Sequence, residues 1–150
     1  MTKPNYVYVA SSWRNPLQIA VVAALRAAGI AAYDFRNPAP GETGFSWKEI
    51  LEGWLNWSPA EWRTYLDHPI AQTSYKRDKD AMDRADCCVL VLPAGRSSHL
   101  EAGYMAGRNK PVYSLVLQQV EPDLMQLLCG PADNICVSMM ELLAKLGVED

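Results

Sequence analysis

A carboxylate stands near the expected start of a helix, in the segment His99–Tyr104. The helix is predicted over about Ser98–Arg108, so Glu101 would lie in its first turn, at the mouth of the preceding strand. The positive end of a helix holds a carboxylate ionised and fixed, as a carboxylate nucleophile requires. A glutamate that merely complements the helix dipole is the commoner arrangement on spacing alone, so both interpretations stay open at this point.

A second carboxylate, Asp78, falls on the apolar side of a helix predicted over about Pro69–Ala85. The positions seven and three residues before it and four after it are Ala71, Tyr75 and Met82. An aspartate on an apolar stripe is costly unless it is paired or functional. The charged neighbours are predicted on other, solvated faces: Arg77, Lys79 and Asp80. Two carboxylates at one crevice suit cleavage at the anomeric carbon of a sugar, where one attacks and the other transfers protons.

Two loops that precede predicted helices combine hydroxyl groups with an arginine. The first contains Ser11, Ser12, Trp13 and Arg14, and the second contains Gly95, Arg96, Ser97 and Ser98. Backbone N–H groups, a helix dipole, hydroxyls and a guanidinium together suit an anion such as phosphate. The alternative is ordinary helix capping beside a surface arginine. Neither GxxxxGK[ST] nor GxGxxG occurs, so nothing indicates a P-loop or a dinucleotide site.

The elements that must position these residues alternate between strand and helix. The expected strands are Tyr6–Ala10, Ala31–Phe35, Cys87–Leu92, Pro111–Leu117 and Asn134–Val137. The expected helices are Leu17–Ala28, with Asn15 as N-cap and Pro16 first, then Pro69–Ala85, Ser98–Arg108, Glu121–Leu128 and Ser138–Leu146. This alternation predicts an α/β domain with a parallel sheet and helices on both faces. Ligands of such sheets bind at the carboxyl ends of the strands, here after Ala10, Phe35 and Leu92.

One stretch, at about residues 37–67, interrupts the alternation. Turn-forming residues lead into a segment that holds four of the five tryptophans, Trp47, Trp54, Trp57 and Trp62. Ser58–Glu61 is typical of a capped helix start. A long interruption of a compact domain is usually a binding element or a lid. The alternative for the tryptophans is the core of a lid or a subunit interface.

The composition fits one domain over residues 1–150. The net charge of −3 and a pI near 5.4 argue against binding of a nucleic-acid polymer, which usually needs a basic excess. No run of about 18 apolar residues predicts a membrane span, and the first residues lack a signal-peptide pattern, so a cytoplasmic protein is expected. The four cysteines lack CxxC spacing, which favours buried free thiols over a metal site.

Three motifs in the same order resemble the nucleoside 2-deoxyribosyltransferase family, which includes the deoxynucleoside 5′-monophosphate N-glycosidases. They are Tyr8–Trp13, Asp78 before Ala85–Asp86, and the loop and helix start Gly95–Gly103. The resemblance spans about residues 6–137 and is weakest in the aromatic interruption. It implies a flavodoxin-like, five-stranded parallel sheet, no metal or organic cofactor, and a homodimer or a higher homo-oligomer.

The resemblance also implies cleavage of an N-glycosidic bond, with transfer of the sugar to another base or to water. Glu101 would attack C1′ of the sugar, Tyr8 would orient Glu101, and Asp78 would protonate or hold the departing base. Aromatic side chains could sandwich that base, namely Trp13, Phe35, Phe45 and Trp47. The sugar or phosphate end would meet Ser11, Ser12, Arg14, Gly95, Arg96 and Ser97.

One departure concerns the loop before the nucleophile, where the transferases carry another aspartate and this chain has Gly95. The Ser12–Arg14 segment is similar to the first loop of the monophosphate hydrolases, which favours an anionic substrate. Two alternatives stay open. A TIR-like domain shares the architecture and uses a helix glutamate to cleave NAD, and a non-catalytic nucleotide-sensing module would bind without turnover.

Overall fold

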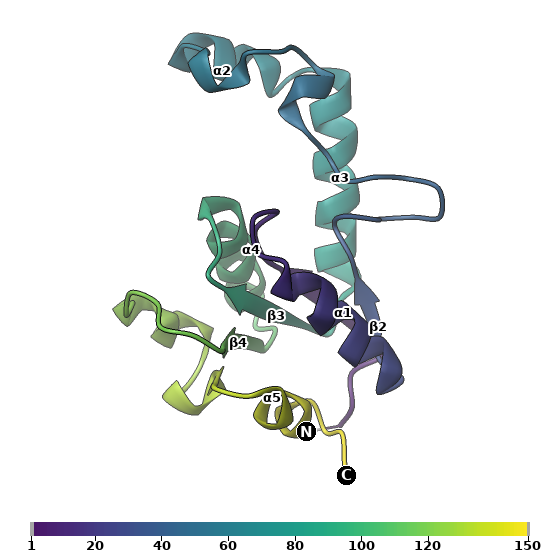
Figure 1. Cartoon of the computed structure of the whole chain (residues 1–150), viewed down its shortest axis with the longest axis vertical. Helices are drawn as coiled ribbons and strands as arrows, with labels where there is room; N and C mark the ends of the chain where they lie inside the picture. The colour runs from purple at the N-terminus through teal and green to yellow at the C-terminus, as the bar shows by residue number, and fades with distance from the viewer. Residues whose placement is uncertain (1, 150) are drawn as a thin grey trace. The chain divides into compact units, whose positions relative to one another are not determined.

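The computed structural model describes residues 2–149, and it contains a five-stranded parallel sheet, part of which is labelled in Figure 1. The strands are β1 (Tyr6–Ala10), β2 (Ala31–Tyr33), β3 (Cys87–Leu92), β4 (Val112–Val116) and β5 (Ile135–Cys136). They lie in the order β2-β1-β3-β4-β5, and every neighbouring pair is parallel. This is the flavodoxin-like order, so the predicted fold class is confirmed.

The chain forms two compact units. One comprises the residues up to Asp34 together with those from Met82 onward and contains the whole sheet, and the other is Phe35–Ala81. The first unit holds α1 (Leu17–Ala27), α4 (Arg96–Gly107) and α5 (Met139–Lys145). The helix α3 (Pro69–Arg84) begins in the second unit and ends in the first.

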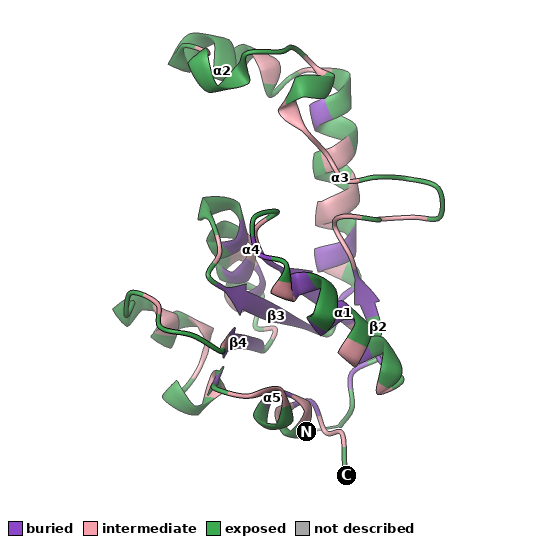
Figure 2. Cartoon of the chain, viewed as in Figure 1, coloured by how far each residue is buried: buried purple, intermediate pink, exposed green. Residues whose placement is uncertain are grey.

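Strand alternation divides the side chains of the sheet between two helical layers. Odd-numbered residues such as Val7, Val89 and Leu115 form one apolar cluster with Leu25 of α1 and Leu142 of α5. Even-numbered residues face the other side, where α4 packs on β1, β3 and β4. The run β3 is buried at every position (Figure 2), as expected of a central parallel strand. This second face carries Tyr8, Cys88 and Ser114.

Several predicted boundaries were wrong. The α-helix expected at Glu121–Leu128 is instead the 3₁₀ helix η3 (Leu124–Cys129), because Asp123 accepts a hydrogen bond from the Met125 N–H at 2.9 Å and starts the turn there. The second strand ends at Tyr33 rather than Phe35, and the last strand shrinks to two residues. Both are edge strands of the sheet, paired on one side only.

The second unit contains a small cluster of half-buried aromatic rings. It contains the 3₁₀ helices η1 (Trp47–Glu49) and η2 (Trp54–Asn56) and the helix α2 (Pro59–Tyr65). The predicted cap is present, since Ser58 and Glu61 exchange side-chain hydrogen bonds with each other's N–H groups. Successive ring contacts link Phe45 to Trp47 at 4.8 Å, Trp47 to Trp57 at 5.7 Å, and Trp57 to Tyr65 at 4.3 Å.

The cysteines of the described chain are free thiols, and three of the four are buried. Burial, the largest cause, and the Asp86 charge raise the pKa of the Cys87 thiol to about 12. Burial also raises the pKa of Cys88, Cys129 and Cys136. In the unfolded chain these thiols lose their protons near pH 9, while the folded chain keeps them protonated to higher pH.

We therefore expect the free energy of unfolding to fall as the pH rises from about 9 towards 12. The cause is ionisation of thiols in the unfolded state alone, with a slope of up to about 1.4 kcal/mol per pH unit for each thiol. Urea denaturation at a series of pH values measures this slope. In Cys87→Ala the slope should be shallower, and an unchanged slope in that variant would contradict the assignment.

Candidate functional site

The sheet has its topological switch point between β1 and β3. From β1 the chain passes to β2 on one side, and later to β3 on the other. The loops that leave β1 and β3 therefore diverge at their carboxyl ends, where ligands of open α/β sheets bind. Both loops predicted to hold an anion begin at this point.

Two hydrogen bonds join these loops. The Ser11 hydroxyl donates to the Val91 carbonyl at 2.9 Å, and the Asn15 side-chain amide donates to the Pro93 carbonyl at 3.1 Å. Ser11 and Asn15 are both buried, so each bond replaces lost contacts with water. The structure therefore gives Ser11 a structural partner on the neighbouring strand.

Asn15 also starts α1. Its side-chain oxygen accepts a hydrogen bond from the Leu17 N–H at 3.1 Å, as predicted for an N-cap followed by Pro16. The side-chain oxygen of Asn15 thus caps α1, and its side-chain nitrogen joins the loop after β1 to the loop after β3.

Replacing Asn15 by alanine should lower the free energy of unfolding by about 1–2 kcal/mol, because both bonds are lost. Asn15→Ser keeps a capping oxygen but is too short to reach Pro93, so its loss should be smaller. Urea denaturation of the three proteins gives the two differences. Equal losses in both variants would show that the cap contributes nothing.

The central contact of the site joins β1 to α4. The Tyr8 hydroxyl donates a hydrogen bond to the Glu101 carboxylate. The Tyr8 side chain is only 1% exposed, and its ring stacks on Tyr33 with centroids 5.3 Å apart and an interplanar angle of 15°. Packing therefore holds the ring of Tyr8, and Tyr8 in turn holds one oxygen of Glu101.

The charge of Glu101 also acts on the sheet beneath it. Cys88, which pairs with Tyr8 in the register of β1 and β3, is completely buried. Burial raises the pKa of its thiol well above the ordinary value, and the negative charge of Glu101 is the next largest cause. Glu101 thus carries its carboxylate close to the central strands.

The helix start differs from the expectation. α4 begins at Arg96 with Gly95 as N-cap, so Arg96 and Ser97 lie in the first turn and Glu101 lies in the second. The reason is that Gly95 has the extended backbone of an N-cap, whereas Ser98 is buried inside the helix. The helix dipole weakens beyond the first turn, so the structure holds Glu101 by the Tyr8 hydroxyl rather than by first-turn placement.

The side chains proposed for an anion surround this edge of the sheet. Trp13 is half exposed, Arg14 and Arg96 are exposed, and the Ser12 hydroxyl accepts the Arg14 N–H at 3.1 Å. Gly95 brings no side chain to cap α4, which leaves room for a ligand at the N–H groups of its first turn. Their role in binding stays a prediction.

The remaining predicted residues belong to the second unit, namely Asp78, Phe35, Phe45 and Trp47. Asp78 is half-buried on α3, but the apolar stripe is interrupted because Tyr75 is 58% exposed. Arg77 was expected on a solvated face, yet its guanidinium pairs with Glu42 at 2.9 Å. Phe45 and Trp47 belong to the aromatic cluster, and whether they also contact a base stays a prediction.

Tyr33 is the site residue that the sequence did not single out. It pairs directly with Tyr8 in the register of β1 and β2, so both rings lie on the face covered by α4. The sequence does place one tyrosine near the middle of each of the two expected strands. Two such rings stack when the strands pair in a register that sets them side by side. The alignment itself follows only from the folded sheet.

Within residues 2–149, no group of three histidine, cysteine, aspartate or glutamate side chains is placed to hold a metal ion. No helix of that described part is long and apolar enough to cross a membrane.

Comparisons with known proteins add a fold-level likeness. No protein-family model matches the chain, and no curated protein matches it. Among solved structures, the chain is similar to a 2-deoxyribosyltransferase from the psychrotolerant bacterium Bacillus psychrosaccharolyticus, a biocatalyst for synthesis of antiviral and antitumoral nucleosides. Identity is 22%, the match covers 80% of this chain and 78% of that chain, and the TM-score is 0.47.

Proposed function

We propose that this protein cleaves the N-glycosidic bond of a nucleoside or nucleoside 5′-monophosphate, with Glu101 as the nucleophile. The observation that carries the proposal is the hydrogen bond from Tyr8 to Glu101. A buried and stacked tyrosine orients a carboxylate on α4, the helix that follows β3 at the switch point of the sheet. A fixed carboxylate suits both attack at C1′ and stabilisation of an oxocarbenium-like transition state.

In the first step, the Glu101 oxygen that does not receive the Tyr8 hydrogen bond attacks C1′ of the sugar. The bond from C1′ to the base nitrogen breaks, and its electron pair leaves with the base, which takes up a proton. An ester between Glu101 and the sugar results. In the second step, a nitrogen of another base or a water oxygen attacks C1′ and loses a proton, and the electron pair of the ester returns to Glu101.

Asp78 is our candidate for the group that protonates or holds the departing base. It is half-buried on α3, and a carboxyl group is a residue type that can serve as general acid or base. Ser12, Arg14, Arg96 and Ser97 are our candidates for a 5′-phosphate, because they combine guanidinium groups, hydroxyls and helix N–H groups. A 5′-monophosphate is therefore the substrate form that we favour.

A substrate panel tests the proposal. Ribo- and deoxyribonucleosides, their 5′-monophosphates and NAD are incubated with the protein, with and without a free acceptor base, and chromatography follows base release and base exchange. We expect release or exchange that depends on Glu101, with the monophosphates as the better substrates. Nicotinamide release alone would favour the TIR-like alternative, and tight binding without turnover would favour a sensing module.

A further inference from the structure

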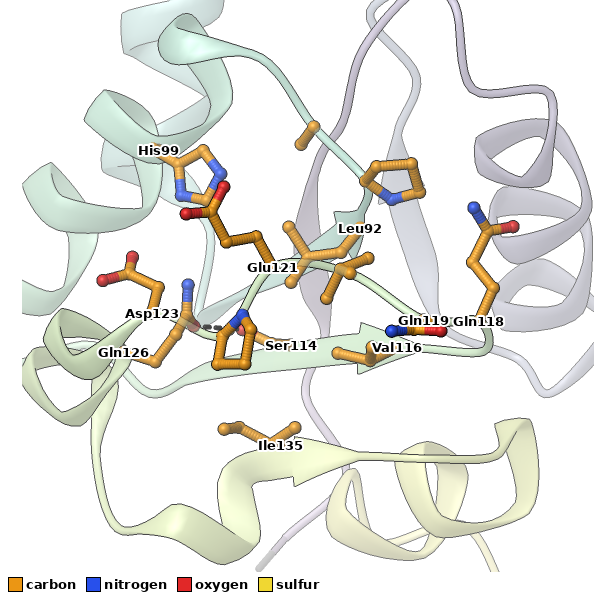
Figure 3. Close-up of a pocket in the computed structure, with 14 residues that line it drawn as sticks. Leu92, His99, Ser114, Val116, Gln118, Gln119, Glu121, Asp123, Gln126 and Ile135 are labelled. Atoms are coloured by element: carbon orange, nitrogen blue, oxygen red, sulfur yellow. Dashed lines mark hydrogen bonds between the residues drawn. The ribbon is translucent and has the colours of Figure 1, made fainter.

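A cavity lies on the face of the sheet covered by α4, at the carboxyl ends of β3 and β4. It has a volume of about 790 Å³ and is lined by fourteen residues of the first unit (Figure 3). Leu92 and Ser114 come from the strands, His99 from α4, and Gln118–Asp123 from the segment that follows β4. Those fourteen residues, all in the described chain, include neither Tyr8 nor Glu101.

The cavity and Glu101 use different faces of α4. His99 and Glu101 are two residues apart, which is about 200° around a helix. Glu101 meets Tyr8 on β1, whereas His99 lines the cavity beside β4. The two side chains therefore lie on opposite faces of α4, so a ligand in the cavity need not contact Glu101.

Two carboxylates line the cavity, Glu121 and Asp123, and ionised carboxylates only accept hydrogen bonds. The Ser114 hydroxyl, buried in the sheet, donates to the side-chain oxygen of Gln126 at 2.7 Å. Figure 3 shows Glu121 and His99 directed toward the same part of the cavity. Within residues 2–149, Glu121 makes no side-chain hydrogen bond or ion pair, so its carboxylate can accept from a ligand.

The charges of the cavity select against anions. Glu121 and Asp123 are acidic, and none of the fourteen lining residues is lysine or arginine. The other walls include apolar side chains such as Leu92, Val116 and Ile135, which suit a flat ring. We propose that this cavity binds a planar aromatic amine or amidine whose N–H groups donate hydrogen bonds to the Glu121 carboxylate.

Benzamidine is a suitable probe, and benzoate is its matched control, because the ring is the same and the charge is reversed. The chain has two histidines, His68 in the second unit and His99 in the cavity. Their imidazole protons are therefore two resolvable reporters in ¹H NMR. We expect benzamidine to shift the His99 resonances in a saturable manner, with little change at His68 and no saturable response to benzoate.

Glu121→Gln removes the charge with little change of shape, and should weaken benzamidine binding by about tenfold or more. The exposed Glu149 offers a matched control, since Glu149→Gln removes one charge outside the cavity. Three results would overturn the proposal: no saturable shift at His99, an equal response to benzoate, or unchanged affinity in Glu121→Gln. Far-UV circular dichroism checks that both variants are folded.

The cavity does not depend on the chemistry proposed for Glu101. Benzamidine has no glycosidic bond, so its binding can be measured whether or not the protein cleaves nucleosides. The titration is repeated on Glu101→Gln, and the His99 response should be retained there. Loss of that response would show that the cavity and Glu101 form one binding site, which contradicts their assignment to different faces of α4.

Discussion

Glu101→Gln should lower the rate of base release by at least about a thousandfold, because the amide cannot attack C1′ and form the ester. Glutamine has nearly the same shape and keeps an oxygen that accepts the Tyr8 hydroxyl. The fold and substrate binding should therefore survive. The measurement is kcat for the best substrate of the panel, followed by chromatography.

Two further observations separate a nucleophile from a residue that only supports the fold. Rapid acid quench of the wild-type reaction should give a peptide containing Glu101 whose mass has increased by the bound sugar moiety. That adduct should be absent in Glu101→Gln. Glu149→Gln, which removes a carboxylate at an exposed position, should retain full activity. Wild-type turnover in Glu101→Gln would exclude Glu101 as the nucleophile.

Tyr8→Phe should lower kcat by about 10–100-fold while KM changes little, because the hydroxyl orients the nucleophile rather than the substrate. Phenylalanine keeps the ring that stacks on Tyr33 at 5.3 Å, so the sheet should remain intact. The ionised carboxylate loses a hydrogen-bond donor in this variant. The acid limb of the pH–rate profile should therefore move to higher pH.

The double variant Tyr8→Phe, Glu101→Gln tests whether the two residues act as a unit. Once the nucleophile is absent, removal of the hydroxyl should cost almost nothing more in residual rate. Fully multiplicative losses would show that Tyr8 acts elsewhere, for example on the substrate. A purely structural role would lower stability without moving the pH profile.

Local patterns predicted most of the fold. The apolar run at residues 87–92, the Asn15–Pro16 helix start and the Ser58–Glu61 capping box all depend on neighbouring residues, and each lies where it was expected. Parallel pairing followed from the strand–helix alternation. The predicted start of α4 was wrong because its N-cap, Gly95, has no capping side chain that a sequence pattern could reveal.

The site could be predicted only in part from local pattern. The pairing of Tyr8 with Glu101 crosses 93 residues of sequence, and no periodicity signals such a contact. It was expected from the family resemblance alone. The Tyr33 stack and the cavity beside Ser114 were not expected, because both depend on the register between strands.

The division of the chain into two units also has a consequence for synthesis on the ribosome. β1 and β2 emerge first, but β1 is an inner strand, and its second neighbour β3 begins only at Cys87. The intervening unit, Phe35–Ala81, is complete in sequence before that neighbour exists, and its contacts are local and quick to form. At that stage β1 still has one unpaired edge, an aggregation-prone state that ends when β3 emerges and pairs with it.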